Sequence, residues 1–272
     1  VAKGSLTTVV PTVSGTAQVG EKLSVEAGTW APEGVTLTYQ WYRSGRSIKG
    51  ATGSSYTLTG SDYKKKITAK VTGSALGYSS ASKTSKATAK VIAGVLTLGT
   101  ATISGTAQVG QKLTAVPANW APQPVGYTYQ WYRSGKAISK ATKSAYTLAA
   151  SDLDKTITVK VTVHKTGYTT ASVTTEATDA VAPGTLTVGT PTISGTAKVG
   201  KTLAAKPGTW GPGTVSFTYQ WLRNGDVIAN ATKSTYAATS ADADAAITVK
   251  VTGKKTGYTA ATAESVAVTV VA

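Results

Sequence analysis

The chain consists of three consecutive copies of a unit of 90 residues. The string Ser14-Gly15-Thr16-Ala17 occurs again beginning at Ser104 and at Ser194, which is a spacing of 90 residues. The strings Tyr39-Gln40-Trp41 and Gly77-Tyr78 recur with the same spacing. The constant offset indicates that no insertion or deletion separates the copies. A period this long suits whole domains in tandem rather than the short units of a helical solenoid. We therefore expect three domains, of residues 1–92, 93–182 and 183–272.

Each copy shows the period of β-strands. Apolar side chains occupy every second position in 37–41 and again in 67–71, with threonine, glutamine and lysine between them. Such alternation is typical of sheets with one buried and one solvated face. Turn residues such as Ser44-Gly45 separate the runs, and no convincing helical period occurs. The pattern predicts an all-β fold of sandwiches, held without disulfides because the chain has no cysteine.

Several strings of the unit resemble an immunoglobulin-like domain. Trp41-Tyr42-Arg43-Ser44-Gly45, Ser55-Tyr56-Thr57-Leu58 and Ser61-Asp62 look like strands C to F, and Val19-Gly20-Glu21-Lys22-Leu23 is similar to the start of strand B. More narrowly, the unit resembles the immunoglobulin-like repeats of secreted and cell-surface proteins of Gram-positive bacteria, especially actinobacteria. The resemblance covers all three copies. It implies three tandem immunoglobulin-like β-sandwich domains and an extracellular or cell-surface location.

Composition limits the functions that such a chain can have. A single histidine and no cysteine remove many nucleophiles, general bases and metal ligands, so we expect no enzyme, no cofactor and no metal. The 28 basic and 12 acidic residues give a net charge of +16, which is compatible with an anionic partner. No apolar run approaches the roughly 20 residues that span a bilayer. We expect a monomer without membrane insertion and without specific nucleic-acid binding, since no basic helix or aromatic RNA-binding strand is recognisable.

Two sets of aromatic residues recur in all copies. The first set falls on inward positions of the predicted strand C and is expected in the core: Trp41, Trp131 and Trp221. The second set falls in the predicted B–C and F–G loops at one end of the sandwich: Trp30, Trp120, Trp210, Tyr78, Tyr168 and Tyr258. Two interpretations of the second set stay open. It could form a rim that binds a glycan, or it could cap the core and pack against the preceding domain.

A recurring arginine and a recurring aspartate predict one ion pair in each unit. They stand at the end of strand C and in the E–F loop, which an immunoglobulin topology brings to the same end: Arg43 with Asp62, Arg133 with Asp152, and Arg223 with Asp242. An exposed pair contributes only about 0–1 kcal/mol, so its expected value is in fixing loop geometry.

Other polar features occur in only some of the copies. Asp154 and Asp244 add a second carboxylate near these aspartates, but two carboxylates are a poor start for a calcium site. His164 is expected to be a surface residue of an F–G loop. The run Lys64-Lys65-Lys66 occurs in the first copy alone and is expected to be a solvated loop.

Two hypotheses for the function follow. The first is a non-catalytic stalk or spacer of a larger secreted or cell-surface bacterial protein, which presents or tethers another domain. The chain opens inside the phrase that joins the copies, with Gly4 matching Gly94 and Gly184, so a preceding domain is expected. The alternative is an adhesion module that binds a polysaccharide or an anionic cell-wall polymer through repeated weak sites.

Overall fold

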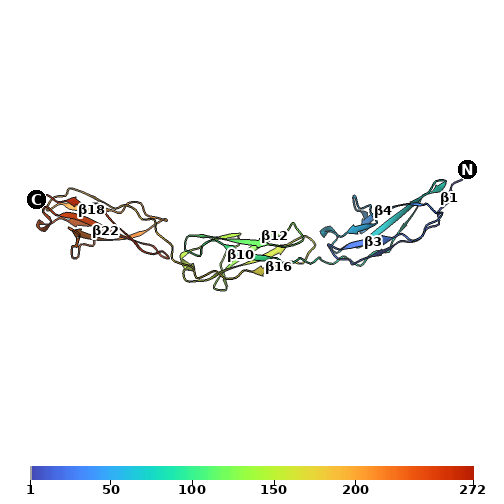
Figure 1. The fold of residues 1–272 in the computed structure, drawn as a ribbon, viewed down its shortest axis with the longest axis horizontal. Coiled ribbons are helices and arrows are strands. Elements are labelled where there is room, and N and C mark those ends of the chain that lie inside the picture. The colour runs from blue at the N-terminus through green and yellow to red at the C-terminus, as the bar shows by residue number, and fades with distance from the viewer. Residues whose placement is uncertain (1) are drawn as a thin grey trace. The chain divides into compact units, whose positions relative to one another are not determined.

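The computed structural model describes residues 2–272, which form β-strands and three short 3₁₀ helices but no α-helix. We refer to the three copies of the sequence unit as repeats 1, 2 and 3. Within the described residues, the strands of each repeat pair with one another and form no sheet with the strands of another repeat; Figure 1 labels strands of all three repeats.

Repeat 1 consists of two main sheets. The first has the order β2-β3-β6, with β2 at Thr12–Ser14, β3 at Lys22–Glu26 and β6 at Ser55–Thr57. The second has the order β5-β4-β7-β9, with β5 at Arg46–Ser47, β4 at Thr36–Arg43, β7 at Ile67–Ser74 and β9 at Ala81–Thr84. A short parallel pair joins β1 (Gly4–Ser5) to β8 (Tyr78–Ser79), and helix η1 covers Gly60–Asp62.

Repeats 2 and 3 have the same two sheets. In repeat 2 the orders are β10-β11-β14 and β13-β12-β15-β16, with bounds Thr100–Ser104, Lys112–Ala118, Ala145–Thr147, Lys136–Ala137, Gly126–Arg133, Ile157–His164 and Ala171–Thr174. In repeat 3 they are β17-β18-β21 and β20-β19-β22-β23, with bounds Thr192–Ser194, Thr202–Lys206, Thr235–Ala237, Asp226–Val227, Ser216–Arg223, Ala246–Lys254 and Ala261–Glu264. The 3₁₀ helices are η2 (Ala150–Asp152) and η3 (Ser240–Asp242).

This strand order is that of an immunoglobulin-like sandwich. The two sheets correspond to strands A-B-E and C′-C-F-G, the division found in immunoglobulin-type domains. Leu23 on the first sheet and Trp41 and Ile67 on the second are fully buried in one core cluster, so the sheets pack face to face. No residue of the described chain is a cysteine. The predicted fold, three tandem immunoglobulin-like β-sandwiches without disulfides, is confirmed.

The tryptophan of strand C is fully buried in each core. Trp41, Trp131 and Trp221 are all 0% exposed. The indole nitrogen of Trp41 donates a hydrogen bond to the Gly53 carbonyl at 2.9 Å, and the corresponding bonds of repeats 2 and 3 have the same length. A buried indole thus keeps a partner for its only polar atom, which a buried tryptophan needs.

The last segment of repeat 3 is one residue shorter than its counterparts, so the expectation of copies without a deletion is wrong there. The buried valines that end the sandwiches are Val91, Val181 and Val270, whose offset falls from 90 to 89. In repeat 1 the hydroxyl of Thr88 accepts a hydrogen bond from the Ile67 amide at 3.1 Å. Repeat 3 has Val268 instead, which lacks a hydroxyl, and strand β24 (Val268–Thr269) pairs with β22 through its backbone.

By their internal contacts the residues group into two compact units. One comprises Val1–Ala101, Pro117–Tyr129 and Lys160–Thr175, and the other comprises Thr102–Val116, Gln130–Val159 and Glu176–Ala272. The first unit contains the junction between repeats 1 and 2, and the second contains the junction between repeats 2 and 3. The domain boundaries expected from the repeat period, after residues 92 and 182, stay a prediction.

Candidate functional site at the ends of the repeats

A buried carboxylate lies at one end of repeat 1. Asp62, in η1, is 0% exposed and accepts hydrogen bonds from Arg43 Nε at 2.6 Å, Tyr56 Oη at 2.9 Å and the Thr59 amide at 2.7 Å. The Thr59 hydroxyl donates a fourth bond at 2.9 Å. The carboxylate of this ion pair is fully buried, so the small contribution of an exposed pair does not apply to it, and its charge-assisted hydrogen bonds are stronger than bonds between neutral groups.

The surroundings of Asp62 shift its pKa. Burial opposes ionisation, but the hydrogen bonds from Arg43, the Thr59 amide and Tyr56 outweigh it and hold the pKa of the Asp62 carboxyl below its usual value. The same balance lowers the pKa of Asp242 in repeat 3. Burial, together with the hydrogen bond to Asp62, raises the pKa of the Tyr56 hydroxyl. The network is therefore built for an ionised aspartate and a neutral tyrosine.

The corresponding networks recur in repeats 2 and 3. Arg133 and Arg223 each place Nε 2.6 Å from an oxygen of Asp152 or Asp242. The tyrosines that complete these networks, Tyr146 and Tyr236, were not singled out in the sequence, although each stands six residues before its aspartate. The network of repeat 2 lacks the hydroxyl donor, because Ala149 stands at the position of Thr59 and Thr239.

The tryptophans of the B–C loops are buried rather than displayed on a rim. Trp30, Trp120 and Trp210 are 7%, 2% and 7% exposed. The indole nitrogen of Trp30 donates to the Ala27 carbonyl at 3.0 Å, and its ring lies against Gly73 of β7, where an added Cβ would come within 2.7 Å of it. No face of these rings is free to stack on a sugar, so their burial argues against the glycan interpretation and favours capping of the core.

Repeat 2 accommodates its tryptophan differently. Val163 stands where repeats 1 and 3 have Gly73 and Gly253, so the space that the ring fills in those repeats is taken. The Trp120 indole instead donates to the Thr100 carbonyl at 3.3 Å, and its strand β11 is longer than β3. The capping role thus tolerates two arrangements of the same ring.

The F–G tyrosines lie against the start of their own repeats. Tyr78 pairs in parallel with Gly4, and Tyr168 and Tyr258 make the same bridges to Gly94 and Gly184. A Cβ on Gly94 would lie 2.6 Å from Cε1 of the Tyr168 ring and 2.6 Å from the Val19 carbonyl of repeat 1. Glycine is therefore required here by the close approach of a ring and a backbone, and Tyr168 lies at the junction with repeat 1.

Backbone and glutamine hydrogen bonds complete the junction of repeats 1 and 2. The Val19 amide donates to the Ile92 carbonyl at 3.1 Å within repeat 1, which fixes the end of that repeat, and the side-chain amide of Gln18 donates across the boundary to the Ala93 carbonyl at 3.0 Å. At the next junction Gln108 makes the equivalent bond to Pro183 at 3.0 Å. Repeat 3 has Lys198 at the position of these glutamines.

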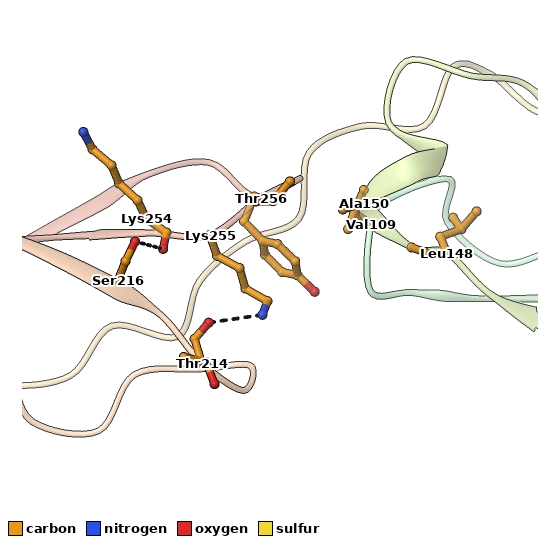
Figure 2. Close-up of a pocket in the computed structure, with 10 residues that line it drawn as sticks. Val109, Leu148, Ala150, Thr214, Ser216, Lys254, Lys255 and Thr256 are labelled. Atoms are coloured by element: carbon orange, nitrogen blue, oxygen red, sulfur yellow. Dashed lines mark hydrogen bonds between the residues drawn. The ribbon is translucent and has the colours of Figure 1, made fainter.

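A lysine completes each junction. At the junction of repeats 2 and 3, side chains line a hollow of about 530 Å³. Val109, Leu148 and Ala150 lie on one side of it and Lys255 on the other (Figure 2). The ammonium of Lys255 donates to the Thr214 carbonyl at 3.2 Å and lies 5.7 Å from the centre of the Tyr258 ring. Its counterpart Lys165 makes the same contacts at the first junction, whereas repeat 1 has alanine at this position.

The remaining polar candidates are the single histidine and the carboxylates. His164 ends strand β15 rather than lying in the loop, and its Nε2 lies 2.9 Å from the Thr128 hydroxyl. Across residues 2–272 no three side chains of histidine, cysteine, aspartate or glutamate gather to hold a metal ion. Among these residues there is also no helix with the length and apolar character needed to cross a membrane.

Comparison with known proteins gives distant structural likenesses. No protein-family model and no curated protein matches the chain. A Ca²⁺-stabilised adhesin that helps an Antarctic bacterium reach out and bind ice is 17% identical over 98% of this chain and 74% of that one, with a TM-score of 0.34. The amphioxus IgVJ-C2 molecule is 17% identical over 60% and 98%, with a TM-score of 0.31. A D1–D4 ectodomain fragment of ICAM-5 is 14% identical over 97% and 75%, with a TM-score of 0.32. At these values the likeness carries no argument, and the fold assignment rests on the strand order and packing.

Proposed function

We propose that this chain is a non-catalytic spacer of tandem immunoglobulin-like domains in a larger secreted or cell-surface bacterial protein. Its partners are other domains of that protein, which it presents or tethers. The observation that carries the proposal is the position of the recurring side chains. The tryptophans lie in or over the cores, the arginines pair with buried aspartates, and Tyr168 and Tyr258 lie at the junctions. These recurring side chains are thus used to build a repeat or to join it to its neighbour.

A retention assay tests this proposal. The purified chain is mixed with cellulose, with chitin and with Gram-positive cell walls, at low and at high salt, and the bound fraction is measured. A spacer is expected to stay unbound on the neutral polysaccharides at both salt concentrations. Retention on them at high salt would contradict the proposal, because salt screens charge but does not prevent aromatic stacking on sugars. Tyr78→Ala would then test the half-buried tyrosine of repeat 1 as the binding residue.

A second candidate function is adhesion to an anionic cell-wall polymer. The net charge of +16 supports it, because the charge attracts polyanions over the whole surface. This function predicts retention on cell walls at low salt and release at high salt. Adhesion of this kind is compatible with the spacer function, because a spacer that passes through the cell wall would contact its polymers.

A further inference from the structure

Repeat 1 carries a group of exposed cations that the other repeats lack. The group, here called the lysine cluster, consists of Arg46, Lys64, Lys65, Lys66 and Lys90. At the corresponding positions repeat 2 keeps two cations, Lys136 and Lys155, and repeat 3 keeps none. Residues 1–92 as a whole hold 12 of the 28 basic residues and 4 of the 12 acidic ones. The positive charge of the chain is therefore concentrated on repeat 1.

Hydrogen bonds bring the segments of the lysine cluster together. The Lys64 amide donates to the Val91 carbonyl at 2.8 Å, and the Val91 amide donates to the Lys65 carbonyl at 2.9 Å, which places Lys90 beside the lysine run. The Ser44 amide donates to the Lys66 carbonyl at 2.9 Å. The turn between β4 and β5, which leads into Arg46, thus lies next to the run on its other side.

The cluster has no carboxylate to balance it. Within residues 2–272 the ion pairs are those of the three arginines with the buried aspartates, and none includes a member of the cluster. Arg43, which lies opposite Arg46 in the β4–β5 hairpin, is already engaged by Asp62. The five charges are therefore available to an external anion.

An exposed aromatic ring adjoins these charges. Tyr63 is 37% exposed, and the ammonium of Lys64 lies 5.1 Å from the centre of its ring, within cation–π distance. Repeats 2 and 3 have Leu153 and Ala243 at this position. The aromatic residue and the lysines therefore occur together in repeat 1 and are absent together at this loop of repeat 3.

We propose that the lysine cluster and Tyr63 bind an anionic polysaccharide. The cations pair with the carboxylate or phosphate groups of the polymer, and the tyrosine ring packs against a sugar ring. A nucleic acid fits less well, because single strands are held by stacking on successive aromatic rings and the cluster offers a single ring. This proposal deepens the second candidate function by naming its site, and the spacer function does not depend on it.

Repeat 2 supplies a replacement loop of the same shape. The backbone φ angles of Lys64 and Asp154 are 61° and 59°, both in the left-handed region, where aspartate is better tolerated than lysine. The Asp154 amide also donates to the Val181 carbonyl at 3.0 Å, as Lys64 does in repeat 1. The graft Tyr63→Leu, Lys64→Asp, Lys66→Thr therefore gives repeat 1 a loop sequence that this fold already accepts.

The experiment measures binding of the 272-residue chain to polygalacturonate by isothermal titration calorimetry at low salt. The control variant Lys198→Asp, Lys201→Thr removes the same amount of charge from exposed positions of repeat 3. We expect the graft to weaken binding by about tenfold or more and the control by less than about threefold, because local charge acts over the Debye length. Tyr63→Leu alone is expected to weaken binding while leaving its salt dependence unchanged.

Three outcomes would overturn the proposal. The first is no binding of polygalacturonate by the wild-type chain, and the second is an equal loss in the graft and the control, which would assign binding to the overall charge. The third is tighter binding of a single-stranded oligonucleotide with the same sensitivity to the graft, which would identify a nucleic-acid site. None of these outcomes bears on retention by cellulose or chitin, so failure here is distinguishable from failure of the spacer function.

Discussion

Ala149→Thr should stabilise repeat 2 by restoring a hydrogen bond that the other two repeats have. In repeats 1 and 3 the hydroxyls of Thr59 and Thr239 each donate to the buried aspartate at 2.9 Å. The φ and ψ angles of Ala149 are −97° and 167°, against −102° and 169° for Thr59, so the backbone already suits a threonine. Asp152 accepts bonds at 2.6, 2.8 and 2.7 Å from three other donors and has 0% exposure.

The size of the effect follows from these contacts. A hydrogen bond to a charged group contributes about 1.5–3 kcal/mol net. Ordering the threonine side chain and the exposure of this position reduce that gain, so we expect an increase of about 1 kcal/mol in the free energy of unfolding of repeat 2.

Hydrogen exchange of the β15 amides (Ile157–His164) reports this free energy separately from the other repeats. Ala149→Val is the matched control, because valine has the shape of threonine without the hydroxyl. Equal protection in the threonine and valine variants would refute the reasoning, since branching at Cβ rather than the hydrogen bond would then explain the gain.

Three further predictions concern the core, the buried network and a junction. Trp221→Ala should destabilise repeat 3 by about 3–5 kcal/mol, measured as faster exchange of the β22 amides, while exchange in repeat 1 stays unchanged. Since the pKa of Asp62 is lowered in the fold, its stabilisation is fully present above the unfolded value of about 3.9 and is lost as the pH falls through the folded value. In Asp62→Asn, urea unfolding of repeat 1 should lose this acid dependence; an unchanged acid limb would contradict the role of the carboxylate. Gly94→Ala should increase proteolytic cleavage near the junction, because its Cβ would meet the Tyr168 ring. Gly126→Ala is the control, because an added Cβ there comes no closer than 3.8 Å to another atom and the backbone φ of Gly126 is not in the left-handed region.

The fold could be predicted because its signals are local and repeated. Alternation with a period of two in 37–41 and 67–71 defines paired strands without knowledge of their partners, and the triplicate sequence confirms each pattern by repetition. The meeting of Arg43 with Asp62 followed from placing both at one end of the sandwich. Tyr56 was missed because its hydroxyl reaches Asp62 across a turn, with its ring 5.9 Å from that of Trp41, and nothing in the sequence shows that direction.

The burial of the loop tryptophans could not be predicted for a similar reason. A tryptophan before a proline in a loop is compatible with an exposed rim. In repeat 1 the ring packs against Gly73 on a strand 43 residues away, and in repeat 2 Trp120 is buried although a valine stands at the position of this glycine, so no single residue type marks the burial in the sequence. The shortened end of repeat 3 was equally hidden, because every string used to align the copies lies before it. In the shortened segment β24 pairs with β22 through its backbone, whereas in repeat 1 the Thr88 hydroxyl accepts a hydrogen bond from the Ile67 amide.

The central claim is that side chains at the ends of the repeats serve to join them. It is tested most directly by ¹⁵N relaxation of the amides of repeats 1 and 2 in the wild-type chain and in Tyr168→Ala. The account predicts a shared correlation time for the two repeats in the wild type and separate, shorter ones in the variant, with the chemical shifts of both cores unchanged. Independent tumbling in the wild type, or a variant that tumbles as the wild type does, would contradict the claim.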